Sequence, residues 1–259
     1  MSTGTEVLRC ALAEGELVEA LDVRGEAILY GVGGGLRRCD ASGARSLPSL
    51  PQAQPAFSDV VLSDGESYAV SWPSEGGDAR LHALRGETWE AIATASEPRF
   101  VLPLRAGLAY ADTSNRLRLL RDGEELALSE VALNMPRADA GGERILARRP
   151  EDGAVVLSEA VTDGAPQWRV VSDAPGDMPA GFAIDGRPVV AALGVARKDS
   201  SVAPVSELIA VSADGTRERI WSGVGSNFAV AGTAVVFVAP DRRGVPEAVV
   251  LERLTTASD

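Results

Sequence analysis

A glycine turn that recurs along the chain limits its fold more than any other feature of the sequence. Six short apolar runs each end in such a turn, as in LDVRGEAILY and GFAIDGRPVV. The turn glycines are Gly25, Gly65, Gly107, Gly142, Gly186 and Gly232. Because glycine readily adopts the positive φ of a two-residue hairpin turn, each site predicts a β-hairpin. Successive turns lie 35 to 46 residues apart, which indicates a repeated unit of about forty residues.

Each repeat also holds a second glycine turn, and the two turns divide the repeat into four short strands. The second turns lie at Gly43, Gly86, Gly123, Gly164 and Gly215. In the second repeat, the predicted strands cover 58–62, 68–72, 80–84 and 89–93. Four antiparallel strands at a period of about forty residues are typical of a β-propeller blade.

The repeats predict an all-β fold, a six-bladed β-propeller that forms a single domain over residues 1–259. The expected blades cover 17–50, 55–96, 98–131, 132–175, 180–222 and 226–254. The last blade is one strand short, and residues 6–12 have no partner in the first repeat. We therefore expect 6–12 to pair with 247–254 as the outer strand of the last blade, which closes the ring. Seven blades or an array of two-sheet β-sandwiches are the alternatives.

With the turns SDG, IDG, ADGT and RDGE placed in this way, the chain resembles the broad superfamily of bacterial β-propellers. That superfamily includes TolB-like, quinoprotein-like and WD40-like repeats, and the resemblance covers about residues 6–254. The Gly-His and Trp-Asp signatures of WD40 blades are absent, as are the tryptophan-docking motifs of quinoproteins. The resemblance therefore implies an architecture and no particular activity.

Charge and composition exclude several classes of protein. Acidic residues outnumber basic ones by 37 to 25, for a net charge of −12, which argues against nucleic-acid binding. The N-terminus has no signal-peptide pattern and no apolar run could span a membrane, so we expect a cytoplasmic protein. His82 is the only histidine, which rules out chemistry that needs two imidazoles. We expect Cys10 and Cys39 to be free thiols in a reducing compartment.

One candidate site lies on the face where a propeller gathers its long loops. The two longest loops, 194–206 and 239–246, carry Arg197, Lys198, Arg242 and Arg243 in an otherwise acidic protein. These residues predict a docking patch for an acidic segment of a protein partner. The alternative is that they are ordinary solvated loop tips.

A second candidate site is the mouth of the central channel, which the starts of the inner strands line. The polar residues expected there are Glu19, Asp59, Arg99, Asn134, Arg137 and Asn227. Their carboxylate and amide oxygens could hold a hard divalent cation, as in the lactonase-type six-bladed hydrolases. The two arginines instead favour an anion or neutralise the carboxylates. The alternative is a water-filled channel with balanced charges, and we assign no metal.

The leading functional interpretation is a non-enzymatic module that binds a protein partner, because no catalytic set is evident and no cofactor is expected. A metal-dependent lactonase-like or phosphoesterase-like hydrolase that uses the channel is the main alternative. A carbohydrate-binding lectin is a third possibility, with tryptophans as stacking platforms. These tryptophans are Trp72, Trp89, Trp168 and Trp221.

Overall fold

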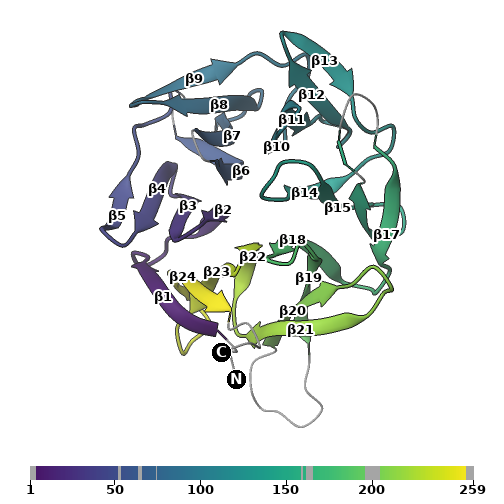
Figure 1. Ribbon diagram of the computed structural model, residues 1–259. Helices are drawn as coiled ribbons and strands as arrows, with labels where there is room; N and C mark the ends of the chain where they lie inside the picture. Colours follow the sequence, from purple (N-terminus) through teal and green to yellow (C-terminus); the bar gives the residue numbers. More distant parts are fainter. Residues whose placement is uncertain are drawn as a thin grey trace.

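The structure, a computed structural model, describes residues 4–51, 54–63, 66–73, 75–158, 160–161, 166–195 and 205–254. In this part of the chain, small antiparallel β-sheets are arranged around a common centre in a β-propeller-type fold (Figure 1). The predicted all-β fold is therefore confirmed. No helix in the described ranges is long and apolar enough to cross a membrane.

Four of the sheets contain four strands each, and each is a simple meander. The first two sheets consist of β2 (Val18–Arg24), β3 (Ala27–Val32), β4 (Gly35–Asp40) and β5 (Gly43–Ser46), then β6 (Pro55–Leu62), β7 (Ser67–Pro73), β8 (Arg80–Arg85) and β9 (Thr88–Ile92). The next two consist of β10 (Phe100–Leu104), β11 (Gly107–Ala111), β12 (Leu117–Arg121) and β13 (Glu124–Ala127), then β14 (Asn134–Ala138), β15 (Ile145–Arg148), β16 (Val155–Ser158) and β17 (Trp168–Ser172). These sheets match the first four predicted repeats.

The predicted glycine turns account for the hairpins of these sheets. Every turn glycine in the described residues has a positive φ, from 59° at Gly25 to 142° at Gly107. Gly65 and Gly164 lie outside the described residues. Since a side chain at positive φ strains the backbone, glycine at these positions lets each strand fold back on the previous one.

The remaining strands form one eight-stranded sheet, where the sequence predicts two separate blades. Its order is β1-β24-β23-β22-β18-β19-β20-β21. The strands are β1 (Gly4–Ala11), β18 (Asp177–Ala183), β19 (Pro188–Val195), β20 (Val205–Val211), β21 (Arg217–Gly223), β22 (Ser226–Gly232), β23 (Ala234–Pro240) and β24 (Pro246–Leu254). Two meanders are joined by parallel pairing of β18 with β22, in which Gly181 lies opposite Val230.

Gly181 explains why these two meanders join while the other sheets stay separate. A Cβ atom at this position would lie only 2.0 Å from the carbonyl oxygen of Val230. No side chain can be accommodated at that separation, so only glycine permits the two inner strands to approach within hydrogen-bonding distance.

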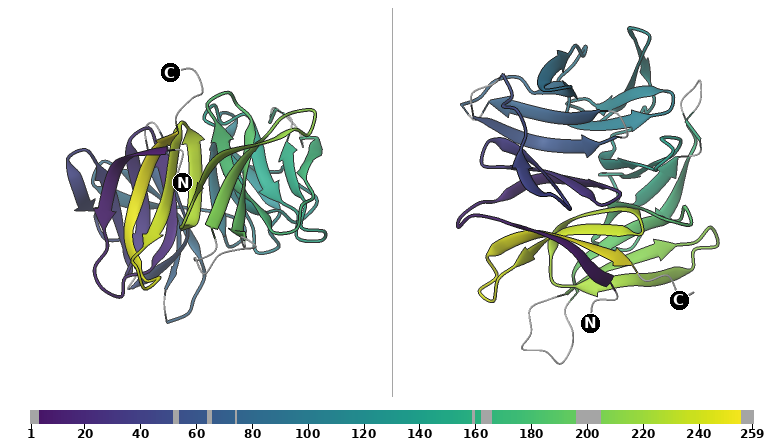
Figure 2. Two further views of the ribbon diagram at one scale, coloured as in Figure 1. Left: turned by 90° about the horizontal axis from the view of Figure 1, so that it is seen from below. Right: turned by 60° about the vertical axis from the view of Figure 1, so that its left-hand side comes forward.

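The N-terminal strand β1 pairs with β24, as the sequence predicts. The pairing is antiparallel and runs from Gly4 opposite Leu254 to Ala11 opposite Ala248. Both views in Figure 2 show the purple N-terminal strand beside the yellow C-terminal strands. The first and last strands of the chain therefore share one sheet.

The apolar core lies between neighbouring sheets and follows the apolar strands of the repeats. In β12, Leu117 and Leu119 are buried against β15 and β16, whereas Arg118 between them is half-buried. A separate cluster links the two ends of the chain, because Cys10 of β1 and Val236 of β23 pack with Tyr30 of β3. Such burial is the main stabilising contribution in a sheet that is covered on both faces.

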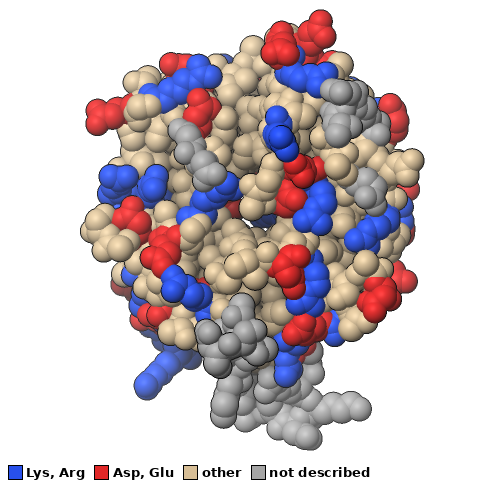
Figure 3. All heavy atoms as spheres, viewed as in Figure 1, with Lys and Arg blue, Asp and Glu red and all other residues tan. Residues whose placement is uncertain are grey.

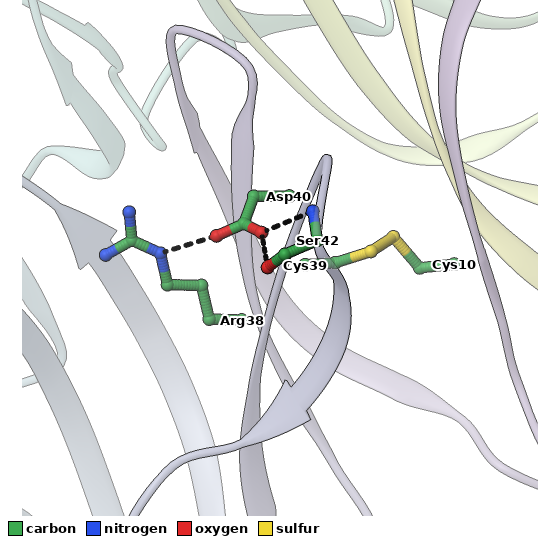
Figure 4. The surroundings of a disulfide bond; sticks show 5 residues. All are labelled: Cys10, Arg38, Cys39, Asp40 and Ser42. Carbon is green, nitrogen blue, oxygen red and sulfur yellow. Dashed lines mark hydrogen bonds and ion pairs between the residues drawn. A yellow bond between two sulfur atoms is a disulfide. The ribbon is translucent and has the colours of Figure 1, made fainter.

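Cys10 and Cys39 form a disulfide bond, so the expectation of two free thiols is wrong. Their Cα atoms lie 6.4 Å apart and both residues are almost fully buried. Figure 4 shows the bond crossing from β1 to β4, near the ion pair of Arg38 with Asp40. In the sequence the two cysteines appear isolated because they lie 29 residues apart. Only the placement of β1 next to the first sheet brings them together.

The disulfide should contribute strongly to stability, because it links the first sheet to a strand of the last one. We expect the double substitution Cys10→Ala and Cys39→Ala to lower the free energy of unfolding by about 3 kcal/mol, from the loss of a covalent loop of this length. Denaturant unfolding of the oxidised wild type and the double variant measures this loss.

Each single variant is the matched control and should lose about as much as the double variant, since either change breaks the same bond. An unaltered free energy of unfolding, or two titratable thiols in the oxidised wild type, would contradict the assignment.

Candidate functional site

A cavity of about 650 Å³ occupies the centre of the molecule. Each of the inner strands β2, β6, β10, β14, β18 and β22 contributes to its lining, together with the turns that follow them. The cavity therefore lies toward the end of the channel where the short glycine turns gather. Viewed down the centre, the molecular surface has a small hollow there, with basic and acidic side chains at its rim (Figure 3).

Carboxylates from one sheet bind the inner strand of the next sheet along the channel. The backbone N–H groups of Phe57 and Leu62 in β6 donate to Glu19 (2.6 Å) and Asp22 (2.8 Å) of β2. The N–H of Val101 in β10 donates to Asp59 of β6 (3.0 Å). The inner strands β6 and β10 each have a sheet neighbour on one side only, so these carboxylates satisfy backbone donors that would otherwise be unpaired.

Asp22 has the most strongly perturbed pKa among the groups that line the cavity. Asp22 is half-buried, and desolvation of its carboxyl group among the inner strands raises its pKa to about 6, from an ordinary value of 3.8. The positive charge of Arg137 and the hydrogen bond from Leu62 act in the opposite direction, while the charge of Asp59 raises the pKa further. Burial also raises the pKa of Asp59. Carboxyl groups that titrate near neutrality are candidates for proton transfer.

Arg137 supplies the opposite charge in the same space. Its Nη1 donates to Oδ1 of Asp59 at 3.3 Å, and only 19% of its side chain is exposed. Its Nε is buried and has no hydrogen-bond partner among the described residues. The structure therefore brings together Asp59 and Arg137, two of the residues predicted from the sequence, and adds Asp22.

The other predicted channel residues lie nearer the opposite end of the inner strands. Glu19 and Asn227 are exposed on the neighbouring strands β2 and β22, and the amide of Asn227 donates to the carbonyl of Val18 (3.0 Å). Arg99 is exposed just before β10, and Asn134 is half-buried at the start of β14. They do not join Asp59 and Arg137 in one constellation.

These residues do not fit a divalent cation. Oδ2 of Asp59 accepts from Val101 and its Oδ1 accepts from Arg137, whose positive charge opposes a bound cation. Glu19 is held by the backbone of β6. The described part of the chain contains no group of three or more His, Cys, Asp or Glu residues that could hold a metal ion. We therefore derive no chemical step through a metal here.

The predicted partner-binding patch is described only in part. Arg197 and Lys198 lie outside the described residues. Arg242 and Arg243 are exposed in the loop between β23 and β24, and Arg243 pairs with Asp241 in the same loop (2.9 Å). Because an exposed ion pair within one loop contributes little energy, this pair is an ordinary feature of a solvated loop.

Sequence reasoning missed Asp22, although a signal for it exists. In the inner-strand segment ALDV this aspartate is the only polar residue, and in FSDVV Asp59 is the only charged one. A lone acidic residue in a strand that is otherwise buried on both faces requires a partner. The turn pattern points to the starts of the inner strands and so does not indicate Asp22, which lies later in its strand.

Comparisons with known proteins support the fold. No protein-family model matches the sequence, and no curated protein is significantly similar to it. A candidate gluconolactonase of known structure has a TM-score of 0.65 at 16% identity, over 96% of this chain and 94% of its own. A gluconolactonase from Xanthomonas campestris has a TM-score of 0.62 at 12% identity, over 88% of this chain and 82% of its own. The calcium-binding protein regucalcin from Agrobacterium tumefaciens has a TM-score of 0.59 at 12% identity, over 92% of this chain and 90% of its own.

These likenesses overturn the leading interpretation of a non-enzymatic interaction module. The similar structures are described as lactonases and as a calcium-binding protein, which agrees better with the channel hydrolase that was the main alternative. Two of the four tryptophans of the lectin interpretation are not available for stacking: Trp89 and Trp221 are buried in blade cores, where Trp221 packs against the rings of Phe228 and Phe237. Trp72 is exposed, so the lectin interpretation stays a prediction.

The pKa of Asp22 predicts how stability depends on pH. Because the pKa of Asp22 is higher in the folded protein than in the unfolded chain, protonation of its carboxyl group stabilises the folded state. This stabilisation is fully present below about pH 4 and is lost as the pH rises through about 6. The Asp22→Asn substitution removes this loss of stability, because the new side chain does not ionise. Its amide oxygen can still accept the hydrogen bond from the N–H of Leu62. We expect the variant to gain about 1–3 kcal/mol on wild type between pH 4 and pH 8.

Denaturant unfolding of both proteins at a series of pH values measures this gain. Asp214→Asn, in an exposed turn, is the matched control and should show no such gain, since the pKa of Asp214 is lowered by the N–H of Thr216. A difference between wild type and Asp22→Asn that stays constant from pH 4 to pH 8 would contradict the raised pKa.

Proposed function

We propose that this chain is a hydrolase of small cyclic esters, of the lactonase type, and that the reaction takes place in the central channel. One observation carries the proposal: Asp22, with a pKa of about 6, lines the same cavity as the guanidinium of Arg137. A general base is most effective when its pKa lies close to the pH at which it works. The likeness to gluconolactonase structures supports the same class of reaction.

In the proposed reaction, Asp22 accepts a proton from a water molecule while the water oxygen attacks the carbonyl carbon of the lactone. The carbonyl oxygen becomes negative, and the positive charge of Arg137 stabilises it. The bond between the carbonyl carbon and the ring oxygen then breaks, and Asp22 returns the proton to the ring oxygen. The product is an open-chain hydroxy acid, which contains every atom of the lactone and the water.

Other residues hold these two groups in place. The N–H of Leu62 fixes one carboxylate oxygen of Asp22, and Asp59 positions Arg137 through its bond to Nη1. A volume of about 650 Å³ suits a small ligand, because binding pockets for small molecules commonly span about 300–1,000 Å³.

We also infer that the ring is a closed propeller of six blades. In this interpretation, the two meanders of the eight-stranded sheet are the fifth and sixth blades, and β1 is the outer strand of the sixth. The β1–β24 pairing, the disulfide to β4 and the six inner strands around one cavity support it. An experimental structure in which β1 does not pair with β24 would contradict closure.

The disulfide bears on the compartment as well. Buried disulfides persist in oxidising surroundings and are rare in the cytoplasm, so we infer an oxidising compartment in place of the expected cytoplasmic location. Alkylation of free thiols in the native cells tests this inference: a protein that is alkylated at both Cys10 and Cys39 after denaturation would contradict it.

The proposed activity predicts that the purified protein opens the rings of small lactones. We expect wild type to hydrolyse members of a panel of γ- and δ-lactones, sugar lactones included, and its rate to rise with pH and level off above about pH 6. Asp22→Asn should lower kcat by at least about 100-fold, because removing a general base typically costs that much. Acid release at constant pH measures the rates.

Asp214→Asn again serves as the matched control and should keep the wild-type rate. Addition of a chelator should leave the rate unchanged, since no step depends on a metal. Wild-type protein that hydrolyses no lactone of the panel would overturn the proposed function, and an Asp22→Asn variant with full activity would overturn the role of Asp22.

A further inference from the structure

Arg137 has an unsatisfied hydrogen-bond donor inside the channel. Its Nε is buried without an acceptor among the described residues, and its one contact with Asp59 is long at 3.3 Å. A buried donor without a partner destabilises the folded state, and more so when the group is charged. Such a group in a native protein calls for an acceptor, and the described residues do not provide one.

The charge of Arg137 shows what kind of acceptor fits. Four arginines line the cavity: Arg24, Arg105, Arg137 and Arg144. Arg105 pairs with Glu143 (2.7 Å), Arg144 with Asp139 (2.9 Å) and Arg137 with Asp59 (3.3 Å), so the charges around the cavity largely balance. Of the four, Arg137 has a buried N–H donor without a partner among the described residues, and a charged donor forms its strongest hydrogen bonds with an anion.

Asp59 does not fully neutralise Arg137. The backbone N–H of Val101 takes one of the two carboxylate oxygens of Asp59, so the ion pair uses only the other. A guanidinium can offer two parallel N–H groups to one carboxylate or phosphate. Because Nη1 of Arg137 donates to Asp59, the N–H at Nε is the donor that remains for a second anionic group.

We infer that the central cavity is a binding site for a small organic anion, whose carboxylate or phosphate group is bound by Arg137. This inference stands without the proposed hydrolysis, because the unsatisfied donor of the Arg137 guanidinium defines the site. If the hydrolysis also holds, the hydroxy acid that it produces carries the carboxylate, and the site then predicts inhibition by product.

Calorimetric titration at low ionic strength tests the inference with three probes: D-gluconate, its neutral amide D-gluconamide, and inorganic phosphate. We expect gluconate or phosphate to bind and gluconamide not to bind, and the anion that binds more tightly identifies the group. Arg137→Gln should weaken binding by about tenfold to a hundredfold, the loss expected for a charged hydrogen bond. Arg219→Gln, on the outer strand β21 where Arg219 is 60% exposed, is the matched control and should bind as wild type does.

A second measurement on the wild type needs no variant. The NMR signal of the Arg137 Nε–H group should shift on addition of the anion and stay unchanged with gluconamide. Absence of binding by both anions would leave only water at Nε and would overturn the inference. Equal binding of gluconamide, or unchanged affinity in Arg137→Gln, would also overturn it. Because no turnover is measured, these outcomes are independent of the lactone assay.

Discussion

The inner strands β2, β6, β10 and β14 each have one edge without a sheet partner, whereas β18 and β22 pair with each other. The groups that satisfy these inner edges determine the chemistry of the channel. Along the first sheets, carboxylates do so: Asp22 and Asp59 each accept an N–H from the next inner strand. Between β18 and β22 the backbone itself does so, because Gly181 has no side chain to keep the strands apart. The carboxylates that bind β6 and β10 place acidic groups at the centre of the molecule. The backbone pairing of β18 with β22 needs no acidic group there.

Acidic groups in the channel cost stability and provide reactivity. Burial raises the pKa of Asp22 to about 6, so its ionised form is disfavoured in the folded protein. The same shift makes the group a suitable proton acceptor near neutral pH. Arg137 offsets part of this cost, and its unsatisfied Nε gives the cavity an affinity for anions. Stability is commonly sacrificed at functional sites in this way.

The repeats could be predicted from the sequence because their determinants are local. Glycine at a tight turn acts on its own hairpin, so the first four sheets and the pairing of β1 with β24 follow from spacing alone. The eight-stranded sheet does not follow, because the role of Gly181 depends on Val230 of another repeat. The disulfide was missed for a similar reason: Cys10 and Cys39 are neighbours only once β1 lies beside the first sheet.

The candidate site was predictable only in part. Asp59 and Arg137 were singled out as polar residues of inner strands, and they do meet. Asp22 could not be predicted as a site residue in the same way. Its raised pKa depends on how closely the atoms of other strands surround it, and a local sequence pattern does not reveal that packing. Among the channel residues whose oxygens could in principle hold a cation, Glu19 is bound by the backbone N–H of Phe57, which a list of oxygen-bearing residues cannot anticipate.

The proposed chemistry of the channel depends on Asp22, a desolvated carboxyl group that changes its ionisation near neutral pH. A titration of its side-chain carboxyl carbon by ¹³C NMR, with Asp22→Asn used to assign the signal, measures this ionisation. We expect an apparent pKa of about 6 for this carboxyl group. A pKa at or below the ordinary aspartate value of 3.8 would contradict it.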